Sequence, residues 1–371
     1  MTSPAGASPI EVMVVDDSAV VRRFVTEVLT TEADIVVNQT AQNGNLALQR
    51  LEAHQPDVVL LDIEMPVLDG LSTLAQLRKR WPHLPVVMFS TLTTRGASAT
   101  LDALALGATD YVSKPSHLGD LETGRAVVAA ELIPVVRSCA AVGRSRLGLS
   151  QRASELAPRS PRQLARAPAR PIRATRADVL VIASSTGGPH ALAEVIPRLP
   201  ATLSVPVLVV QHMPELFTEL LADRLQARSV LTVHHASDGM AIEPANVYVA
   251  PGGKHLVVRR AGTRCVLGTI DDPPENSVRP AADVLFRSAA ACFGAGVVGL
   301  VLTGMGCDGL AGSRAIRDAG GCVYVQDEAS SVVWGMPGSV AKEGLAQAAI
   351  ALGEIADVLT HQLQRTSEVL A

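Results

Sequence analysis

Residues 178–192 read DVLVIASSTGGPHAL, and this stretch decides how the second half of the chain folds. Four of its first six residues are Val, Leu or Ile, which predicts a buried strand. Small residues follow, and Pro189 stands where a helix begins, a position that proline favours. Such a turn places serine hydroxyls beside the free amides of a helix start. Acyl transfer needs a hydroxyl beside donors for an oxyanion, although phosphate binding and a purely structural turn are alternatives.

Two later stretches favour the catalytic interpretation. Residues 205–214 (VPVLVVQHMP) and residues 299–312 (GLVLTGMGCDGLAG) each read as a buried strand followed by a turn. Because the carboxyl ends of parallel strands meet in one crevice, we expect Ser185, His212 and Asp308 to converge as a triad. The G-x-S-x-G elbow of the α/β-hydrolases is absent, which disfavours that family. The neighbouring hydroxyl of Ser184 is the alternative nucleophile.

The first part of the chain alternates apolar runs with helical patterns, which predicts a parallel sheet covered by helices on both faces. The five expected strands lie at residues 12–15, 35–37, 58–61, 86–89 and 111–112. Polar residues follow these runs in register, namely Asp16, Asp17, Asp62, Ser90 and Lys114. Three close carboxylates need a cation, and an oxygen-rich site of this kind suits Mg²⁺. An aspartate there can accept a phosphoryl group, whose oxygens Lys114 and Ser90 would hold; the alternative is a set of unrelated polar residues.

A basic segment separates the two parts. Between Arg137 and Arg176 the chain has ten arginines, no lysine and a single acid, Glu155. The segment is rich in Ala, Pro and Ser, and it shows no hydrophobic periodicity after Leu149. We therefore expect residues 138–177 to form a flexible tether. The arginines are not interleaved with aromatic residues, so a nucleic-acid-binding arm is the less favoured interpretation.

The second part reads as another alternation of strands and helices. Strands are expected at residues 179–183, 207–211, 230–234, 247–250, 297–303 and 322–326, and helices at residues 189–198, 216–226, 280–292, 309–319 and 350–364. Residues 247–270 contain three short β patterns, which predict an antiparallel addition beside the parallel sheet. His234, His235 and His255 lie outside the catalytic strand ends, and we expect them at the surface.

Composition restricts the class of protein. The 371 residues carry a formal net charge of −4 and are 48% hydrophobic, values typical of a globular protein with more than one domain. No run of eighteen apolar residues appears, so we expect no membrane insertion. The first residues lack a basic and apolar signal, which predicts a cytoplasmic protein. The five scattered cysteines have no C-x-x-C spacing and predict neither a disulfide framework nor a zinc site.

The motifs STGGP, QHMP and LTGMGxDG resemble those of the chemotaxis-specific methylesterase family, CheB, and VVDDS, LLDIEMPVLDG and YVSKP resemble the response-regulator receiver family. The resemblance covers nearly the whole chain. It implies an α/β protein with a flavodoxin-like receiver of five parallel strands at residues 10–137. A linker at residues 138–177 and a doubly wound methylesterase domain at residues 178–370, with a small antiparallel addition, would follow.

The resemblance also implies roles in the second domain. Ser185 would be the nucleophile, His212 the general base and Asp308 the residue that orients it, and the backbone amide of Met305 would help to hold the oxyanion. Ester hydrolysis would need no cofactor. The family usually has Gly-Ala before the serine, whereas this chain has Ala183 and Ser184.

In the receiver the resemblance implies that Asp62 is phosphorylated in the presence of Mg²⁺. Asp17, Asp62 and the carbonyl of Glu64 would bind the metal, with Asp16 helping through water. The residues that would read the phosphoryl group are Ser90, Lys114 and the aromatic switch residue Tyr111.

The resemblance thus implies that the chain is a phosphorylation-activated serine hydrolase. Its substrates would be the glutamate methyl esters and glutamines of methyl-accepting chemotaxis receptors, and a histidine kinase of the chemotaxis type would donate the phosphoryl group. The residues leave two other classes of protein open. A response-regulator transcription factor is disfavoured because the second domain is acidic and shows no helix-turn-helix pattern. A catalytically inactive interaction module that retains the fold is the other alternative.

Overall fold

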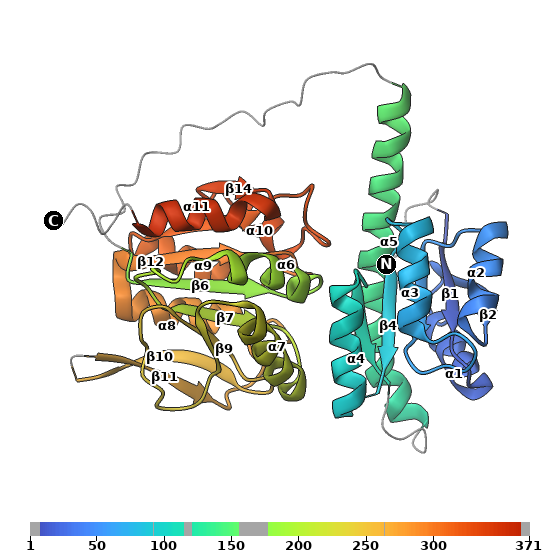
Figure 1. Ribbon diagram of the computed structural model, residues 1–371, viewed down its shortest axis with the longest axis horizontal. Helices are drawn as coiled ribbons and strands as arrows, with labels where there is room; N and C mark the ends of the chain where they lie inside the picture. Colours follow the sequence, from blue (N-terminus) through green and yellow to red (C-terminus); the bar gives the residue numbers. More distant parts are fainter. Residues whose placement is uncertain (1–7, 92, 115–120, 156–176, 263, 365–371) are drawn as a thin grey trace. The chain divides into compact units, whose positions relative to one another are not determined.

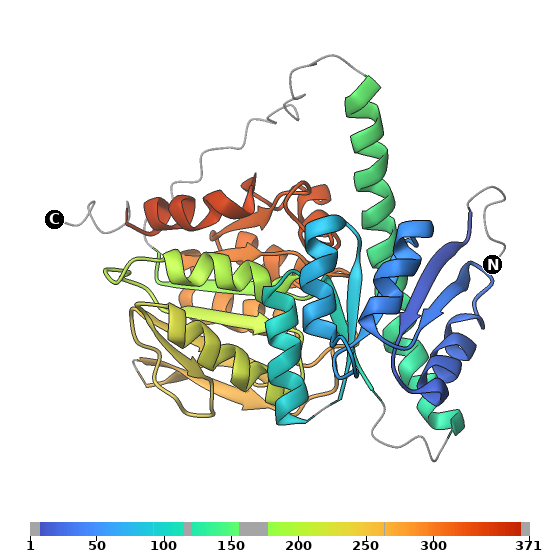
Figure 2. The same ribbon diagram turned by 45° about the vertical axis from the view of Figure 1, so that its right-hand side comes forward.

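The computed structural model divides the chain into two compact units, residues 1–162 and 163–371. It describes residues 8–91, 93–114, 121–155, 177–262 and 264–364. Each unit is an open sheet of parallel strands with helices on both faces (Figures 1 and 2). This is the α/β class expected from the alternation of apolar runs and helical patterns.

The first unit has five parallel strands in the order β2-β1-β3-β4-β5. The strands are β1 Ile10–Val15, β2 Ile35–Ala41, β3 Val58–Asp62, β4 Val86–Ser90 and β5 Asp110–Ser113. The helices are α1 Ala19–Leu29, α2 Gly44–Ala53, α3 Gly70–Arg80, α4 Thr94–Ala105 and α5 Leu121–Glu155. β3 and β4 are buried along their whole length, as expected for strands covered on both faces. Helices α1 to α4 each begin at a residue whose side chain accepts a backbone N–H: Ser18, Asn43, Asp69 and Thr93.

Helix α5 corrects the prediction that the tether begins at residue 138. The helix continues to Glu155, and Cys139 and Ala140 are buried in the core that it forms with α1. Arg137 donates to Glu32 and Asp34, at distances of 2.6 to 2.9 Å. The arginines that suggested a disordered segment therefore include structural ones. Residues 156–176 of the expected tether lie outside the described residues.

Arg144 fixes the helix further along the chain. Its guanidinium donates to both carboxylate oxygens of Asp57 at 2.8 and 2.7 Å, and to the carbonyl oxygens of Ser8 and Pro9. Asp57 in turn accepts the backbone N–H of Glu11. Burial alone would raise the pKa of Asp57, but Arg144 and this backbone hydrogen bond lower it. The ion pair thus joins α5 to the amino-terminal edge of the sheet.

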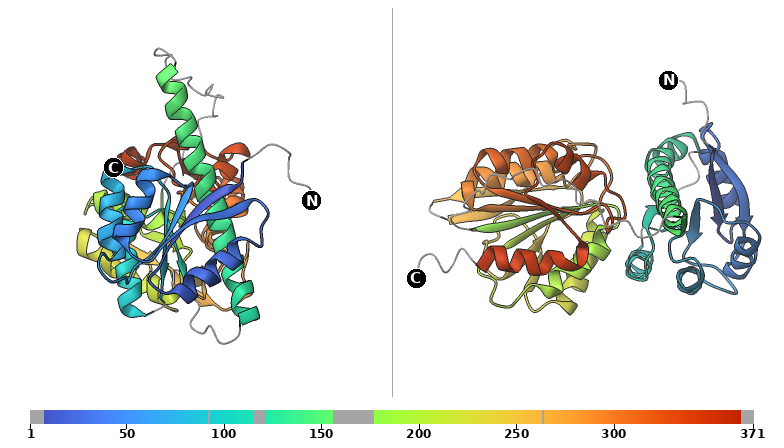
Figure 3. Two further views of the ribbon diagram at one scale, coloured as in Figure 1. Left: turned by 90° about the vertical axis from the view of Figure 1, so that its right-hand side faces the viewer. Right: turned by 90° about the horizontal axis from the view of Figure 1, so that it is seen from above.

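The second unit has seven parallel strands in the order β14-β13-β12-β6-β7-β9-β8. They are β6 Val179–Ser184, β7 Val207–Gln211, β8 Thr232–His235, β9 Asn246–Val249, β12 Val297–Val301, β13 Cys322–Gln326 and β14 Ala348–Ile350. The α-helices are α6 Gly188–Val195, α7 Glu215–Arg228, α8 Ala282–Phe293, α9 Leu310–Asp318, α10 Met336–Lys342 and α11 Leu352–Gln364, and short 3₁₀ turns lie at Ile196–Arg198 and Gly294–Gly296. Helices α8, α9 and α10 cover one face of the sheet, and α6, α7 and α11 cover the other (Figure 3).

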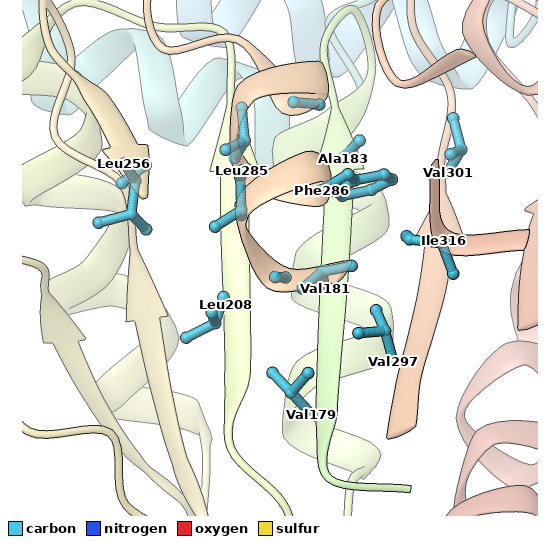
Figure 4. Packing of buried hydrophobic residues seen from close by; sticks show 14 of the residues in the cluster. Val179, Val181, Ala183, Leu208, Leu256, Leu285, Phe286, Val297, Val301 and Ile316 are labelled. Atoms are coloured by element: carbon cyan, nitrogen blue, oxygen red, sulfur yellow. The ribbon is translucent and has the colours of Figure 1, made fainter. Parts of the chain in front are cut away.

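The chain order of these strands creates a switch point. β7 lies on one side of β6, and β12, which comes much later in the chain, lies on the other. At such a point the loops that leave neighbouring strands diverge, and a crevice opens at the carboxyl ends of the strands. The core beneath the crevice joins β6, β7 and β12 to α8 (Figure 4). Phe286 of α8 is fully buried, and Figure 4 shows its ring beside Ala183 of β6.

Several details of the second unit differ from expectation. The expected antiparallel addition is the hairpin of β10 His255–Ala261 and β11 Arg264–Ile270, whereas the first of the three β patterns, β9, pairs in parallel with β7 and β8 in the main sheet. α10 and β14 were not anticipated. The prediction that His255 lies at the surface is wrong: its side chain is buried, and its ring nitrogens contact the backbone of Pro273 and Ala281. A helix suited to crossing a membrane is absent from the described part of the chain.

The packing of α8 gives a test of the core. Phe286→Ala removes a large, fully buried side chain, so we expect it to lower the free energy of unfolding of the second unit by about 3–5 kcal/mol. Urea unfolding would be followed by the fluorescence of Trp334 in a Trp81→Phe background. Val230→Ala, which truncates a side chain that is 68% exposed, serves as the control. An unfolding midpoint as high as that of the control would contradict this packing.

Candidate active site and phosphorylation site

Backbone pairing places the first two expected catalytic residues beside each other. Ser185 follows β6, and its N–H donates to the carbonyl of Thr303, just past β12, at 3.1 Å. His212 follows β7, and its N–H donates to the carbonyl of Ser184 at 3.2 Å. Both hydrogen bonds continue the parallel ladders of β6 beyond the strand ends. The register of the sheet therefore brings Ser185 and His212 to the same crevice.

The two adjacent serines differ in their surroundings. Ser184 is fully buried at the end of β6, and its hydroxyl donates to Oε1 of Gln211 at 2.7 Å. The amide nitrogen of Gln211 donates to the carbonyl of Ser185 at 3.0 Å. Ser185 itself is only partly buried. The hydroxyl of Ser184 is thus engaged within the core, whereas Ser185 lies at the accessible end of the strand.

Close backbone approach shapes the turn around the serine. A Cβ atom added to Gly188, the first residue of α6, would lie 2.0 Å from Oε1 of Gln211. A Cβ atom added to Gly304 would lie 2.8 Å from Cβ of Ser185 and 2.3 Å from Sδ of Met336. The turn that begins at Gly304 therefore lies directly against Ser185. Met305, the expected oxyanion residue, follows in this turn, and its side chain is 37% exposed.

His212 and Asp308 form a buried pair. Nε2 of His212 lies 2.8 Å from Oδ2 of Asp308, and the two side chains are 9% and 2% exposed. Because a carboxylate can only accept, we assign the proton of the neutral ring to Nε2. Nδ1 then carries the lone pair and is the ring nitrogen that can act as a base. No hydrogen bond joins the Ser185 hydroxyl to the ring among the described residues, and such bonds often tighten only with substrate present.

Backbone amides hold the Asp308 carboxylate. The N–H groups of Ala282 and Asp283, at the start of α8, donate to it at 2.6 and 3.0 Å, and the N–H of Gly309 donates at 3.0 Å. Burial alone would raise the pKa of Asp308, but the hydrogen bond with His212 and these amides outweigh it and lower the pKa. Asp308 therefore stays ionised, and a helix start adds a favourable field for its charge.

The expected phosphorylation site lies at the strand ends of the first unit. Oxygen atoms of Asp16, Asp17 and Asp62 all lie within 4.8 Å of one another. Nζ of Lys114 lies 2.8 Å from Oδ2 of Asp16 and 2.7 Å from Oδ1 of Asp62. Asp16 and Asp62 are buried, and Asp17 is exposed. The donor set, carboxylate oxygens at an accessible edge, fits Mg²⁺.

Asp62 carries an unusual charge balance. Its burial raises its pKa to about 6, and the neighbouring charge of Asp16 acts in the same direction, whereas Lys114 lowers it. The single positive charge of Lys114 therefore does not offset the burial of Asp62 together with the neighbouring charge of Asp16. A divalent cation would supply the missing charge.

The other expected receiver residues lie around this cluster. The Ser90 hydroxyl accepts a hydrogen bond from Thr100 of α4 at 2.7 Å and lies 3.2 Å from the carbonyl of Gly96. Glu64 is exposed and lies 3.5 Å from Arg95. Burial raises the pKa of the Tyr111 hydroxyl, and nearby acids raise it further. Ser90 therefore links the phosphorylation edge to α4.

Comparisons with known proteins agree with the sites described in both units. Residues 12–124 match the response regulator receiver domain, and residues 180–359 match the CheB methylesterase family. The protein-glutamate methylesterase/protein-glutamine glutaminase of Trichodesmium erythraeum is 42% identical over 352 residues, which cover 95% of this chain and 98% of that relative. Its counterpart from Nocardioides sp. is 46% identical over 358 residues, 96% of each chain.

The chain belongs to the protein-glutamate methylesterase/protein-glutamine glutaminase family. Among solved structures, the CheB methylesterase catalytic domain of Thermotoga maritima is 39% identical and covers 50% of this chain and 98% of that one, with a TM-score of 0.49. The family models and the two relatives confirm the resemblance noted in the motifs. Membership of a methylesterase family decides against a DNA-binding output domain.

Sequence reasoning missed several polar residues of this methylesterase. Gln211, Asn276, Asp283 and Thr303 are buried or hydrogen-bonded around the crevice. Gln211 stands beside His212 in the QHMP motif, and Thr303 opens the TGMG turn, so their positions gave a signal. Asn276 and Asp283 precede and open α8, and no motif marks them.

The raised pKa of Asp62 gives a test in protein freed of metal by a chelator. A carboxyl group with a raised folded-state pKa contributes stability below its ordinary pKa of 3.8, and that stability is lost as the pH rises through about 6. We expect Asp62→Asn, which stays neutral, to stabilise the receiver more at pH 7 than at pH 5. Unfolding would be followed by Trp81 fluorescence in a Trp334→Phe background. Equal effects at both pH values would contradict the shift.

Proposed function

We propose that this methylesterase is a phosphorylation-activated serine hydrolase of methyl-accepting chemotaxis receptors. It hydrolyses glutamate methyl esters to glutamate and methanol and deamidates glutamines, and so adjusts receptor signalling. The observation that carries the proposal is the meeting of strand ends at the β6 switch point, where the partly buried Ser185 and a His212–Asp308 pair whose acid is held ionised follow neighbouring strands. The proposal places the protein in the cytoplasm.

The chemistry follows from the tautomer of His212. The Ser185 hydroxyl attacks the ester carbonyl carbon while its proton moves to Nδ1 of His212, and Asp308 stabilises the imidazolium. The oxyanion that forms accepts a hydrogen bond from the backbone amide of Met305. The intermediate collapses, the bond to the methoxy oxygen breaks, and His212 returns its proton to that oxygen.

A water molecule completes the cycle. It attacks the acyl group on Ser185, His212 takes its proton, and collapse releases the glutamate carboxylate and restores the serine hydroxyl. A glutamine substrate follows the same course, except that a C–N bond breaks and ammonia leaves. No cofactor is required for either reaction.

The receiver supplies control. Asp17, Asp62 and the carbonyl of Glu64 would hold Mg²⁺, with Asp16 helping through water, and the ion would neutralise charge at the site during phosphoryl transfer. Asp62 accepts the phosphoryl group from a histidine kinase of the chemotaxis type. Lys114 then pairs with the phosphoryl oxygens, and the Ser90 hydroxyl leaves its contacts with α4 to bond them, with Tyr111 moving in concert. Phosphorylation can shift the equilibrium toward active forms of the protein only by as much as the phosphoryl group favours those forms over inactive ones.

The nucleophile is tested by comparing the two serines. Ser185→Ala should lower kcat for a receptor methyl ester by about four orders of magnitude or more, because only binding and the oxyanion donors remain. Ser184→Ala removes one hydrogen bond to Gln211 and should keep most of the activity. His212→Ala should be nearly as severe as Ser185→Ala, and Asp308→Asn should be severe while the protein stays folded. Activity retained in Ser185→Ala but lost in Ser184→Ala would move the assignment one residue back.

The phosphorylation site has a separate test. With Mg²⁺ and acetyl phosphate, the full chain should gain a single acid-labile phosphoryl group, seen by mass spectrometry, and its methylesterase activity should rise. Asp62→Asn should remove both effects, and Asp17→Asn should weaken Mg²⁺ binding. Labelling or activation that persists in Asp62→Asn would overturn the assignment.

A further inference from the structure

The side chain of Asn276 stands between two buried acids. Its amide nitrogen donates to Oδ1 of Asp308 at 3.0 Å and to Oδ2 of Asp283 at 2.9 Å. Asp308 and Asp283 are 2% and 3% exposed. Both hydrogens of the amide are therefore used, one for each carboxyl group. A neutral donor in this place separates two groups that would otherwise repel each other.

Each acid also caps the helix to which it does not belong. Asp308 lies in the turn before α9, and it accepts the N–H groups of Ala282 and Asp283 at the start of α8. Asp283 lies in the first turn of α8, and its Oδ1 accepts the N–H of Gly312 at the start of α9, at 2.6 Å. The free amides of a helix start favour a carboxylate. This exchange locks the two helices and the Asp308 turn into one arrangement.

The two oxygens of Asp308 have different tasks. Oδ1 accepts from Asn276 and from the N–H groups of Asp283 and Gly309, whereas Oδ2 faces His212 and the N–H of Ala282. The donors on Oδ1 fix the rotation of the carboxylate. Together with the N–H of Ala282 on Oδ2, they hold Oδ2 toward the imidazole.

The loop that carries Asn276 is itself anchored. Asn276 has a φ of 54°, a left-handed backbone that asparagine tolerates well. The neighbouring Glu275 forms a two-point ion pair with Arg287 of α8 at 2.7 and 2.6 Å, and its backbone pairs with that of Val278. The amide is therefore presented by a rigid support.

We propose that Asn276 and Asp283 are positioning residues of the hydrolase, which hold the Asp308 carboxylate in the orientation that His212 requires. The proposal rests on the proposed function and deepens it. The hydrogen bonds of Asp283 support the proposal. Its two side-chain partners, the amide of Asn276 and the N–H of Gly312, are both donors, and a carboxylate can accept from both. Burial and the charge of Asp308 raise the pKa of Asp283, as expected for acids kept this close.

The cavity beside Asn276 and Asp283 allows both residues to be changed without disturbing the hydrophobic core. Asn276 and Asp283 line an open cavity of about 460 Å³, which Cys307, Leu310 and Arg314 also line. Truncating Asn276 therefore leaves no sealed void. Arg314 touches the same cavity and pairs with Glu343 instead of either acid, so Arg314→Ala is a matched control.

The experiment compares the full chain, activated with Mg²⁺ and acetyl phosphate, with three variants and the Arg314→Ala control, using a peptide that contains glutamate methyl ester. Asn276→Ala should lower kcat about tenfold with KM changed less than about twofold, because a hydrogen bond to a charged group is lost at a residue that does not touch substrate. Asn276→Asp should be more severe, since it adds a third acid. Asp283→Asn should have an effect similar to that of Asn276→Ala. The amide nitrogen of the new side chain would point at either the Asn276 amide or the Gly312 N–H, and two donors cannot form a hydrogen bond. The downfield proton resonance of the His212–Asp308 pair should shift or broaden in all three and stay unchanged in Arg314→Ala.

The outcomes separate the two proposals. A wild-type chain that stays inactive even with Mg²⁺ and acetyl phosphate would overturn the proposed function. An active wild type, with variants that keep its kcat and its downfield resonance, would overturn the positioning roles alone. If each variant loses kcat only in proportion to its unfolded fraction, measured by thermal unfolding, and keeps the downfield resonance, the positioning roles would also be rejected. Should Asn276→Ala fail to fold, Asp283→Asn carries the same test.

Discussion

The arrangement of polar groups at the site of the second unit depends on keeping one buried charge, that of Asp308. A carboxylate removed from water is costly unless donors replace its hydration. Here the donors are backbone amides of two helix starts, the side chain of Asn276 and the ring of His212. Satisfying this charge requires the turn after β12 to reach the start of α8. The orientation of the proposed catalytic pair is therefore a consequence of how the fold solvates an acid.

Asp62, the buried acid of the first unit, has a pKa shifted in the opposite direction. Asp62 has an ammonium group for a partner, a second acid close by and a raised pKa, whereas amides and an imidazole lower the pKa of Asp308. The difference suits the two chemistries that we propose for these residues. A residue that orients a general base must remain ionised and fixed. A residue that accepts a phosphoryl group gains from a site that is short of positive charge until a cation arrives.

The sequence was sufficient for the parts that follow from periodicity and strand order. Alternating apolar runs predicted both sheets, and strand ends predicted which residues gather at each edge. It failed where a partner is distant in the chain. The arginines of α5 resembled those of a disordered tether, because Arg137 and Arg144 pair with acids about a hundred residues earlier. His255 seemed to be a surface residue, because its partners are backbone groups that no motif marks.

The pair Ser184 and Ser185 shows how strand geometry resolves what a motif leaves open. Successive side chains of a strand point to opposite faces, so two neighbouring hydroxyls cannot share one environment. The hydroxyl of Ser184 enters the core and meets Gln211, whose amide then holds the carbonyl of Ser185. Gly188 leaves room for that amide, because any Cβ there would overlap it. A hydroxyl in place of the family's usual alanine is therefore accommodated as a support for the turn. Attack by Ser184 would require its burial and its hydrogen bond to be given up together.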